Sequence, residues 1–372
     1  MQLLRLCANH IKLNQPLPWN VRNEPGALLL RKGFVLTSQA QIDTLLERGV
    51  FVDVEEVEAA RREAAQMKAA KSPFEVWNGI LKRTGVVLRQ FKDNPNFAKD
   101  VMELADQINL AMQEDLEVGT FEMMHLEHTS YAISHSLQTA FVASLAGTRL
   151  GWSDKDRLTL IRAGLTMNIA MLDLQNVLAQ QSGPLSPDQR AEVDTHAKRG
   201  RELLEAANVT CTDWLHTVEH HHVTSDGSGI PKDRSDLSKL ACMIHYADVY
   251  LARISPRASR VAQPVNVAAR DMFMKGGGGE NPYTAAIIKE MGMFPPGSFV
   301  KLANGDTAVV VRKGDTAATP QVHSLIGADG WVFPDSKSRD TSKAEFKVVS
   351  SVPRGNVMLT LNRAKLFGYR TA

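Results

Sequence analysis

The residues best suited to do chemistry in this chain are histidines near its middle. His221 and His222 are consecutive and close a segment of helical periodicity, just before the Gly- and Pro-containing turn at 226–231. His196 lies on an earlier predicted helix, and His135 lies on a helix earlier still. Neutral imidazole is a common ligand of first-row transition metals, so this set indicates a metal site among helices.

An aspartate accompanies these histidines on a later predicted helix. The apolar stripe of residues 240–251 marks this helix, and Asp248 lies beside the stripe. An ionised carboxylate buried without a partner is costly, so we expect a partner or a cation next to Asp248. Each histidine taken alone is more often a hydrogen-bonded core residue, and the alternative of a metal-free protein therefore stays open. The candidate metal ligands are His135, His196, His221, His222 and Asp248.

These side chains need helices to bring them together, and the sequence marks where those helices begin. A helix is predicted from about 130 to 150, and Ser153 is placed to cap the next one. The helix that carries His196 has a strong start, with Ser186 as cap, a proline after it and Gln189 three residues after the cap. The central region is therefore predicted to be entirely helical.

The flanking segments have a different character. Residues 1–54 contain short apolar runs broken by glycines, as in 26–36, which is typical of a small β-rich module. Residues 55–123 are predicted to form a helical linker region, 124–293 the helical domain, and 294–372 a β-rich extension. We therefore expect a mainly α protein, in which a helical bundle domain is flanked by small β-rich modules at both ends.

Composition excludes several classes of protein. Lys and Arg number 43 against 41 Asp and Glu, giving a net charge of +2, which offers no support for a nucleic-acid or membrane partner. No apolar run approaches the ~20 residues of a membrane span, and no signal peptide is recognisable. Cys7, Cys211 and Cys242 are far apart, which argues against a disulfide framework or a thiolate zinc site. We expect a cytoplasmic protein.

The order of these motifs resembles the HD-GYP domain, a bacterial branch of the HD phosphohydrolases. The resemblance covers about residues 129–297, and 293–302 is similar to an extension that often follows the domain. It implies an HD-type helical bundle and hydrolysis of cyclic di-GMP at a site with two or three metals, often iron or manganese. The matching stretches are His135-Ser136, 163–173, His196 with Gly200, His221-His222, 226–231, 247–250, and Arg257 with Arg260.

The resemblance also implies roles for individual residues. It assigns metal binding to the five candidate ligands above, and it matches Arg257 and Arg260 to basic residues that contact substrate phosphates. It further implies that the motif turn contacts protein partners such as diguanylate cyclase-type domains. That turn is represented here by Asp226, Gly227, Gly229 and Pro231.

This chain departs from the family at several functional positions. Met167 and Asn168 stand at the family's His-Asp pair. An amide oxygen is neutral and cannot compensate two cations held close together, and a thioether is a poor ligand for Mn²⁺ or Fe²⁺. The further departures are Met171 for a lysine, Val223 for a glutamate, Tyr131 where some members carry a carboxylate, and Ile230 for the tyrosine of the turn.

We therefore predict a degenerate HD-GYP protein of cyclic di-GMP signalling. It would be a nucleotide-responsive or partner-binding regulator with lost or much reduced hydrolysis, and no catalytic residue is assigned. The alternative is an active cyclic di-GMP phosphodiesterase with one divalent Fe, Mn or Zn on His196, His221 and His222, with Glu192 as a substitute ligand. A third interpretation is a structural adaptor, whose charged segment 55–71 pairs with a second copy in a homodimer.

Overall fold

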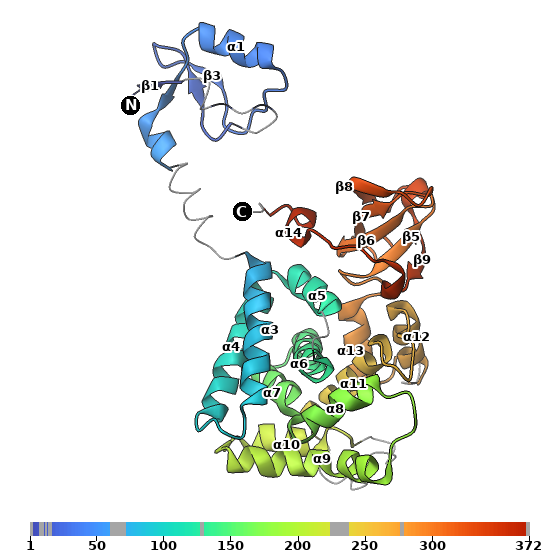
Figure 1. Ribbon diagram of the computed structural model, residues 1–372. Helices are drawn as coiled ribbons and strands as arrows, with labels where there is room; N and C mark the ends of the chain where they lie inside the picture. Colours follow the sequence, from blue (N-terminus) through green and yellow to red (C-terminus); the bar gives the residue numbers. More distant parts are fainter. Residues whose placement is uncertain are drawn as a thin grey trace. The chain divides into compact units, whose positions relative to one another are not determined.

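The computed structural model describes residues 3–6, 11, 13, 17–59, 72–126, 130–223, 238–275 and 279–369. The chain divides into two compact units, Met1–Lys71 and Ser72–Ala372 (Figure 1). No helix in the described part of the chain combines the length and apolarity that crossing a bilayer requires.

The first unit contains a small antiparallel sheet and the helix α1 (Gln39–Glu47). Its strands are β1 (Leu3–Arg5), β2 (Val21–Arg22), β3 (Leu28–Leu30) and β4 (Phe51–Asp53), in the order β1-β4-β2-β3. Helix α1 begins at a capping box between Ser38 and Gln41. The chain turns after the helix at Gly49, whose φ of 66° favours glycine.

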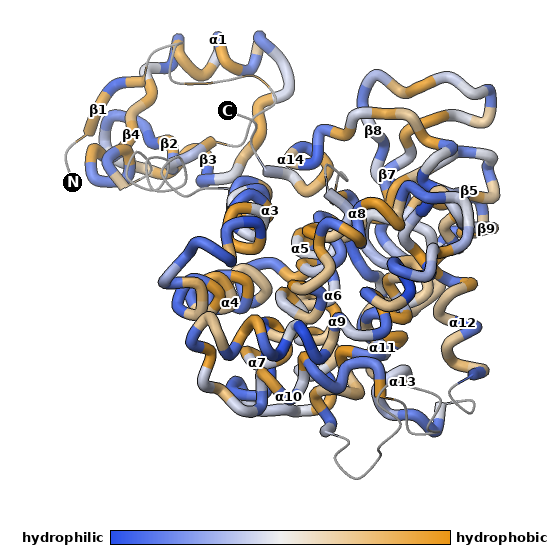
Figure 2. The backbone as a smooth tube through the Cα atoms, turned by 60° about the horizontal axis from the view of Figure 1, so that its bottom comes forward, coloured by the Kyte–Doolittle hydropathy of each residue, from blue (hydrophilic) through white to orange (hydrophobic). Residues whose placement is uncertain are grey.

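The second unit is built around helices. Helix α6 lies at their centre, buried along most of its length, and packs against α7, α11 and α13 (Figure 1). In Figure 2 the backbone of α6 is mostly coloured as neutral to hydrophobic, whereas helices at the outside alternate between hydrophilic and hydrophobic residues. The helices are α3 (Pro73–Arg89), α4 (Phe97–Glu114), α5 (Leu116–His125), α6 (Tyr131–Arg149), α7 (Asp154–Thr166), α8 (Leu172–Gln180), α9 (Pro187–Ala206), α10 (Thr212–His220), α11 (Lys239–Ile254), α12 (Val265–Lys275) and α13 (Pro282–Met291), with a 3₁₀ turn, η2 (Ile169–Met171), before α8.

Close approach of helix backbones sets the geometry near the histidines. A Cβ at Gly164 of α7 would lie 2.6 Å from the Cα of Ala140 in α6, so only glycine allows these two helices to approach this closely. Helix α10 is fixed to α7 by a 2.8 Å hydrogen bond from Trp214 Nε1 to Thr166 Oγ1. Gly200 of α9 packs against Val218 of α10, which aligns the two helices that carry the histidines.

A five-stranded antiparallel sheet closes the second unit. Its order is β8-β7-β6-β5-β9, and short helical turns accompany it. The buried His125 of α5 donates from Nε2 to the carbonyl of Gly297 at 2.8 Å, and Arg363 forms an ion pair with the buried Glu122. The elements are β5 (Phe299–Leu302), β6 (Thr307–Arg312), β7 (Gln321–Ile326), β8 (Val332–Asp340), η3 (Ala344–Phe346), β9 (Val348–Val352), η4 (Arg354–Asn356) and α14 (Arg363–Leu366).

The expected fold class is confirmed: the central region is helical, and small antiparallel sheets lie toward both ends of the chain. From residue 72 on, the segment expected as a helical linker (55–123) forms α3, α4 and most of α5, which share the apolar core with α6. Residues 60–71 of that segment lie outside the described residues. Trp77 of α3, for example, meets Phe141 of α6 edge to face at 5.6 Å between ring centroids. Where one domain ends and the next begins stays a prediction.

Candidate metal centre

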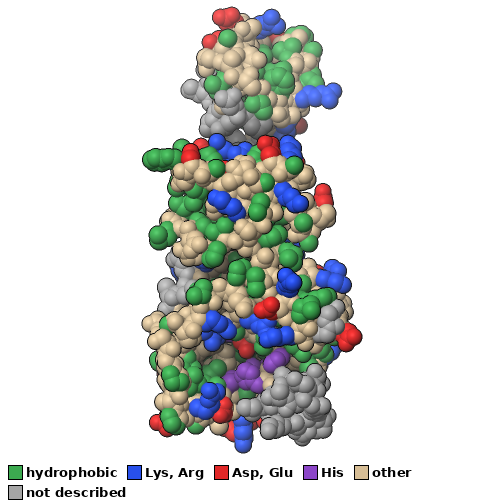
Figure 3. All heavy atoms as spheres, turned by 90° about the vertical axis from the view of Figure 1, so that its right-hand side faces the viewer, with side chains coloured by type: hydrophobic (Ala, Val, Ile, Leu, Met, Phe, Trp, Pro, Cys, Tyr) green, Lys and Arg blue, Asp and Glu red, His purple; other side chains and the backbone are tan. Residues whose placement is uncertain are grey.

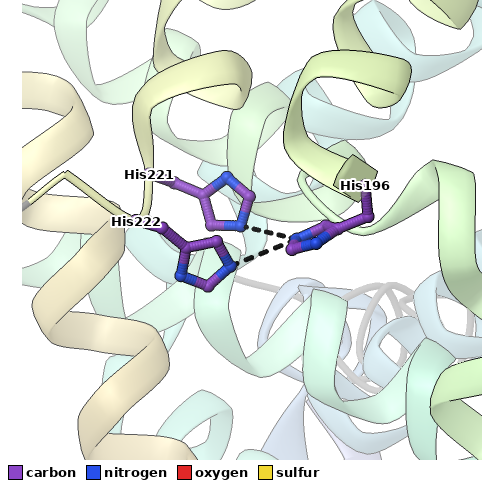
Figure 4. A group of neighbouring side chains, drawn as sticks. All are labelled: His196, His221 and His222. Carbon is purple, nitrogen blue, oxygen red and sulfur yellow. Dashed lines mark hydrogen bonds between the residues drawn. The ribbon is translucent and has the colours of Figure 1, made fainter. Parts of the chain in front are cut away.

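Three histidines converge where α9 meets the end of α10. His196 lies in α9, His221 caps the C-terminus of α10, and His222 follows it (Figure 4). The Nε2 atom of His196 lies 3.2 Å from Nε2 of His221 and 3.2 Å from Nε2 of His222. The three rings can offer one nitrogen each within 4.8 Å of one another. Three imidazole nitrogens this close together match the demand of a divalent transition metal.

Backbone carbonyls fix which nitrogen carries the proton in two of these rings. Nδ1 of His196 donates to the carbonyl of Val193 at 2.5 Å, and Nδ1 of His221 donates to the carbonyl of Val218 at 2.6 Å. A neutral imidazole has one N–H, so both Nε2 atoms carry bare lone pairs that face each other. A cation between them relieves this repulsion, and such backbone contacts commonly orient metal-binding histidines.

Burial also keeps the three rings neutral. Burial lowers the pKa of His196, and it lowers the pKa of the fully enclosed His221 well below its usual value. The pKa of His222 falls to about 4, chiefly through burial and against the raising effect of the Asp248 carboxylate. Neutral imidazole is the ligand form of histidine, so the site is ready for a metal at neutral pH.

A second pair of candidate ligands lies beside this triad. His135 of α6 and Asp248 of α11 are 2.6 Å apart between Nε2 and Oδ1. Burial raises the pKa of Asp248, but the hydrogen bond that Asp248 accepts from His135 outweighs this effect, and the net pKa lies well below its usual range. A carboxylate therefore stays charged next to three neutral rings, which is a donor set that attracts a cation.

Of the three rings of the triad, only His222 is partly exposed. His196 and His221 are 1% exposed, but His222 is half-buried. Figure 3 shows histidine side chains reaching the surface of the helical unit, with acidic and basic side chains close by. Among the described residues, the triad is the only group of three or more His, Cys, Asp or Glu side chains that lie close enough together to share a metal ion. Glu192, which is half-buried on α9, is not part of this group.

The residues that we interpreted from the sequence as departures from the family pattern are mostly buried. Met167 ends α7 with no exposed surface, and Val223 is 2% exposed. Asn168 is 3% exposed, and its Oδ1 has no hydrogen-bond partner among the described residues. Met171 is half-buried at the end of η2. None of these four side chains brings a negative charge into the core.

Arg257 and Arg260 lie in a tight turn after α11, in which each backbone N–H donates to the carbonyl of the other residue. Their guanidinium groups reach different partners. Arg257 donates to the hydroxyl of Tyr131, whereas Arg260 donates to the carbonyl of Ala252. The motif-turn residues Asp226, Gly227, Gly229 and Pro231, together with Ile230, lie outside the described residues.

The comparison with known families agrees with this geometry. The family model described as HD domain matches residues 120–280, the stretch that contains all of the helices just described at the site. This chain carries an HD domain. The HD domain here is also a distant homologue of the HD-GYP phosphodiesterases, which confirms the resemblance noted from the sequence.

Two curated relatives show how distant that homology is. The chain is 27% identical over 299 residues to 3'3'-cGAMP-specific phosphodiesterase 3 of Vibrio cholerae, covering 74% of this chain and 61% of the relative's length. It is 24% identical over 327 residues to cyclic di-GMP phosphodiesterase PA4108 of Pseudomonas aeruginosa, covering 80% of this chain and 79% of that protein.

A solved structure shares the fold. It is Bd1817, an HDG"Y"P protein from Bdellovibrio bacteriovorus, which is 16% identical in sequence and superposes with a TM-score of 0.50. The match covers 77% of this chain and 99% of that one. At this identity the likeness supports the fold of the HD domain alone.

Two features of the HD site were missed by sequence reasoning. The carbonyls of Val193 and Val218 each lie three residues before the histidine that they orient, a spacing that helical geometry could have revealed. Tyr131 was noted only as a departure from the family, yet it holds Arg257. Nothing in the sequence indicates that contact, because the two residues are 126 positions apart.

Proposed function

We propose that this HD domain binds one divalent transition metal on His196, His221 and His222. We further propose that it acts in cyclic-dinucleotide signalling as a nucleotide-responsive or partner-binding regulator with lost or much reduced hydrolysis. The convergence of three Nε2 atoms, two of them with lone pairs set by backbone carbonyls, carries the metal assignment. The homologues named for cyclic-dinucleotide hydrolysis support the class of ligand.

The proposal of reduced hydrolysis rests on charge. Two cations held close together need an anionic ligand between them. The family resemblance places Asn168 at the position of that ligand, where Asn168 offers only a neutral amide. Met167 is buried and brings a soft thioether instead of an imidazole. A single ion would supply positive charge to one phosphate oxygen. The remaining work of binding and orienting the nucleotide would fall to side chains of this chain.

An active phosphodiesterase with a reduced site is the second candidate. One observation favours it: His135 and the negatively charged Asp248 are paired at 2.6 Å next to the three rings of the triad. Five candidate ligands thus persist in one region of the HD domain. In this version His221→Ala and Asp248→Ala both abolish turnover.

Turnover of cyclic di-GMP decides between these functions. The full chain is prepared without oxygen, supplied with Fe²⁺ or Mn²⁺, and sampled by chromatography for linear and mononucleotide products. We expect binding of cyclic di-GMP without product over hours, and a measurable gain of turnover in the Met167→His/Asn168→Asp double variant. Product from the unmodified protein that disappears in His221→Ala would instead establish the phosphodiesterase.

The metal is tested separately by elemental analysis. We expect about one equivalent in the unmodified chain and in His323→Ala, whose half-buried histidine lies in β7, away from the triad. His196→Ala and His221→Ala should lose it. A metal content that is the same in all four proteins would contradict the assignment of the triad.

A further inference from the structure

We propose that Tyr131 is a positioning residue for Arg257, holding its guanidinium ready to bind a phosphate of the ligand. The ligand part of this inference rests on the proposed function. Nε and Nη2 of Arg257 both donate to the Tyr131 hydroxyl, at 2.9 and 2.5 Å. The guanidinium carbon also lies 4.8 Å from the centroid of the Tyr131 ring. One side chain thus holds the arginine by its hydroxyl and by its ring.

Tyr131 is itself a rigid support. It is 7% exposed at the start of α6, and its ring stacks on His135 with 5.4 Å between centroids and 13° between planes. His135 in turn is paired with Asp248 beside the triad. A continuous chain of contacts therefore runs from Arg257 through Tyr131 and His135 to Asp248. A phosphate held by Arg257 would lie at the same side of the HD domain as the metal ligands.

The charge of Arg257 is left uncompensated by this arrangement. Its partner is the phenol of Tyr131, which carries no charge at neutral pH. Within the part of the chain that the structure describes, no carboxylate lies at ion-pair distance from Arg257. Guanidinium has five N–H donors, and the two used here leave others for an anion. A planar, positively charged guanidinium with N–H donors still available can bind a phosphodiester.

The presence of a tyrosine rather than a carboxylate at position 131 has a physical consequence. A carboxylate at this position would either take a metal or neutralise the arginine, whereas a phenol does neither. A free arginine loses rotamer freedom when it binds a ligand, and one that is already held loses less. Removing the hydroxyl should therefore weaken phosphate binding although the hydroxyl need not touch the phosphate.

The closing experiment is a double-variant cycle with cyclic di-GMP as the probe, measured by calorimetry on the full chain. Tyr131→Phe keeps the ring that stacks on His135 and removes both hydrogen bonds. We expect about tenfold weaker binding in Tyr131→Phe and in Arg257→Ala, and no further loss when the two are combined. Tyr250→Phe is the matched control, because that buried hydroxyl has no hydrogen-bond partner among the described residues, and it should leave binding unchanged.

A ligand-free measurement separates this inference from the proposed function. ¹⁵N relaxation of Arg257 Nε should report a restricted side chain in the unmodified protein and a mobile one in Tyr131→Phe, with equal metal content in both. Unchanged binding in Tyr131→Phe, or losses that add up in the double variant, overturns the positioning role and leaves the proposed function standing. A restricted Arg257 in a protein that does not bind cyclic di-GMP supports the positioning role and overturns the phosphate assignment, together with the nucleotide-responsive form of the proposed function.

Discussion

Nε2 of His196 lies 3.2 Å from Nε2 of His221, and each ring donates its only proton to a carbonyl of its own helix. Two lone pairs are thereby directed at each other in a nearly dry environment. Such an arrangement is unfavourable for the protein alone and favourable once a cation is shared, because the cation replaces a repulsion with two coordinate bonds. The metal that we propose would therefore add to the stability of the helical unit.

Metal removal should therefore lower stability in a way that depends on the triad. A ligand at a hundredfold excess over its dissociation constant adds about 2.7 kcal/mol to the free energy of unfolding. We expect a chelator to lower the melting temperature of the unmodified chain and of His323→Ala, and to have little effect on His196→Ala. Scanning calorimetry with and without chelator measures this. Equal responses of all three proteins would show that the triad holds no metal.

Acid should destabilise the contact between α5 and the C-terminal sheet. Burial, followed by the positive charge of Arg354, lowers the pKa of His125 to about 3, against a smaller raising effect of its bond to Gly297. Because the folded-state pKa lies below the unfolded value of about 6.5, the unfolded chain binds more protons between these values. The stability contributed by neutral His125 is present above pH 6.5 and is lost as the pH falls toward 3, at up to about 1.4 kcal/mol per pH unit.

The variant His125→Gln isolates this effect from that of the other buried histidines. Its amide can still donate to the carbonyl of Gly297 but does not titrate. Urea unfolding between pH 7 and pH 4.5 should show a shallower decline for His125→Gln than for the unmodified chain. Parallel declines would assign the acid sensitivity to other groups.

The ion pair between Glu122 and Arg363 should stabilise the attachment of α14. Two bonds, 2.8 and 2.9 Å long, join Arg363 Nη1 to a carboxylate whose side chain is 5% exposed. Arg363→Ala leaves that carboxylate buried and unpaired, and because Arg363 is itself half exposed we expect a cost of about 2 kcal/mol. Chemical denaturation measures the loss. The Glu122→Gln/Arg363→Ala variant should regain part of it, since the buried charge is gone, and a loss equal to that of the single variant would contradict this account.

Gly164 should tolerate no side chain. A Cβ there meets backbone atoms of Ala140 at 2.6 Å, and a helix backbone cannot yield as a flexible side chain can. We expect Gly164→Ala to cost about 3 kcal/mol or to prevent folding, because α6 and α7 must move apart. Gly79→Ala in α3 is the control: nothing lies within 4 Å of the position that its methyl group would take, and alanine there should raise stability by up to about 1 kcal/mol. Similar melting temperatures for the two variants would refute the close-approach argument.

Much of the fold follows from local sequence. Ser186, the proline after it and Gln189 predict the start of α9, and the structure has a capping box there. Helix α6 was expected from about 130 to 150 and spans Tyr131–Arg149. Local rules succeed here because caps and apolar periodicity act within a few residues. They could not show that α3, α4 and α5 join the same core as α6, since packing between helices depends on shapes that a linear pattern does not contain.

The sequence by itself determined the kinds of chemistry available to this protein: imidazoles and a carboxylate on helices, and neutral or apolar residues at Met167 and Asn168. Tertiary structure alone decided which atoms meet. It brings His135 to Asp248 across 113 positions, directs Nε2 of His196 toward His221 and His222, and holds Arg257 on Tyr131. The physical reason is that metal ligands must be placed to within tenths of an ångström. Their positions depend on how the helices cross and on which backbone carbonyl each imidazole ring bonds. Residue spacing fixes the face of a helix but not its neighbour.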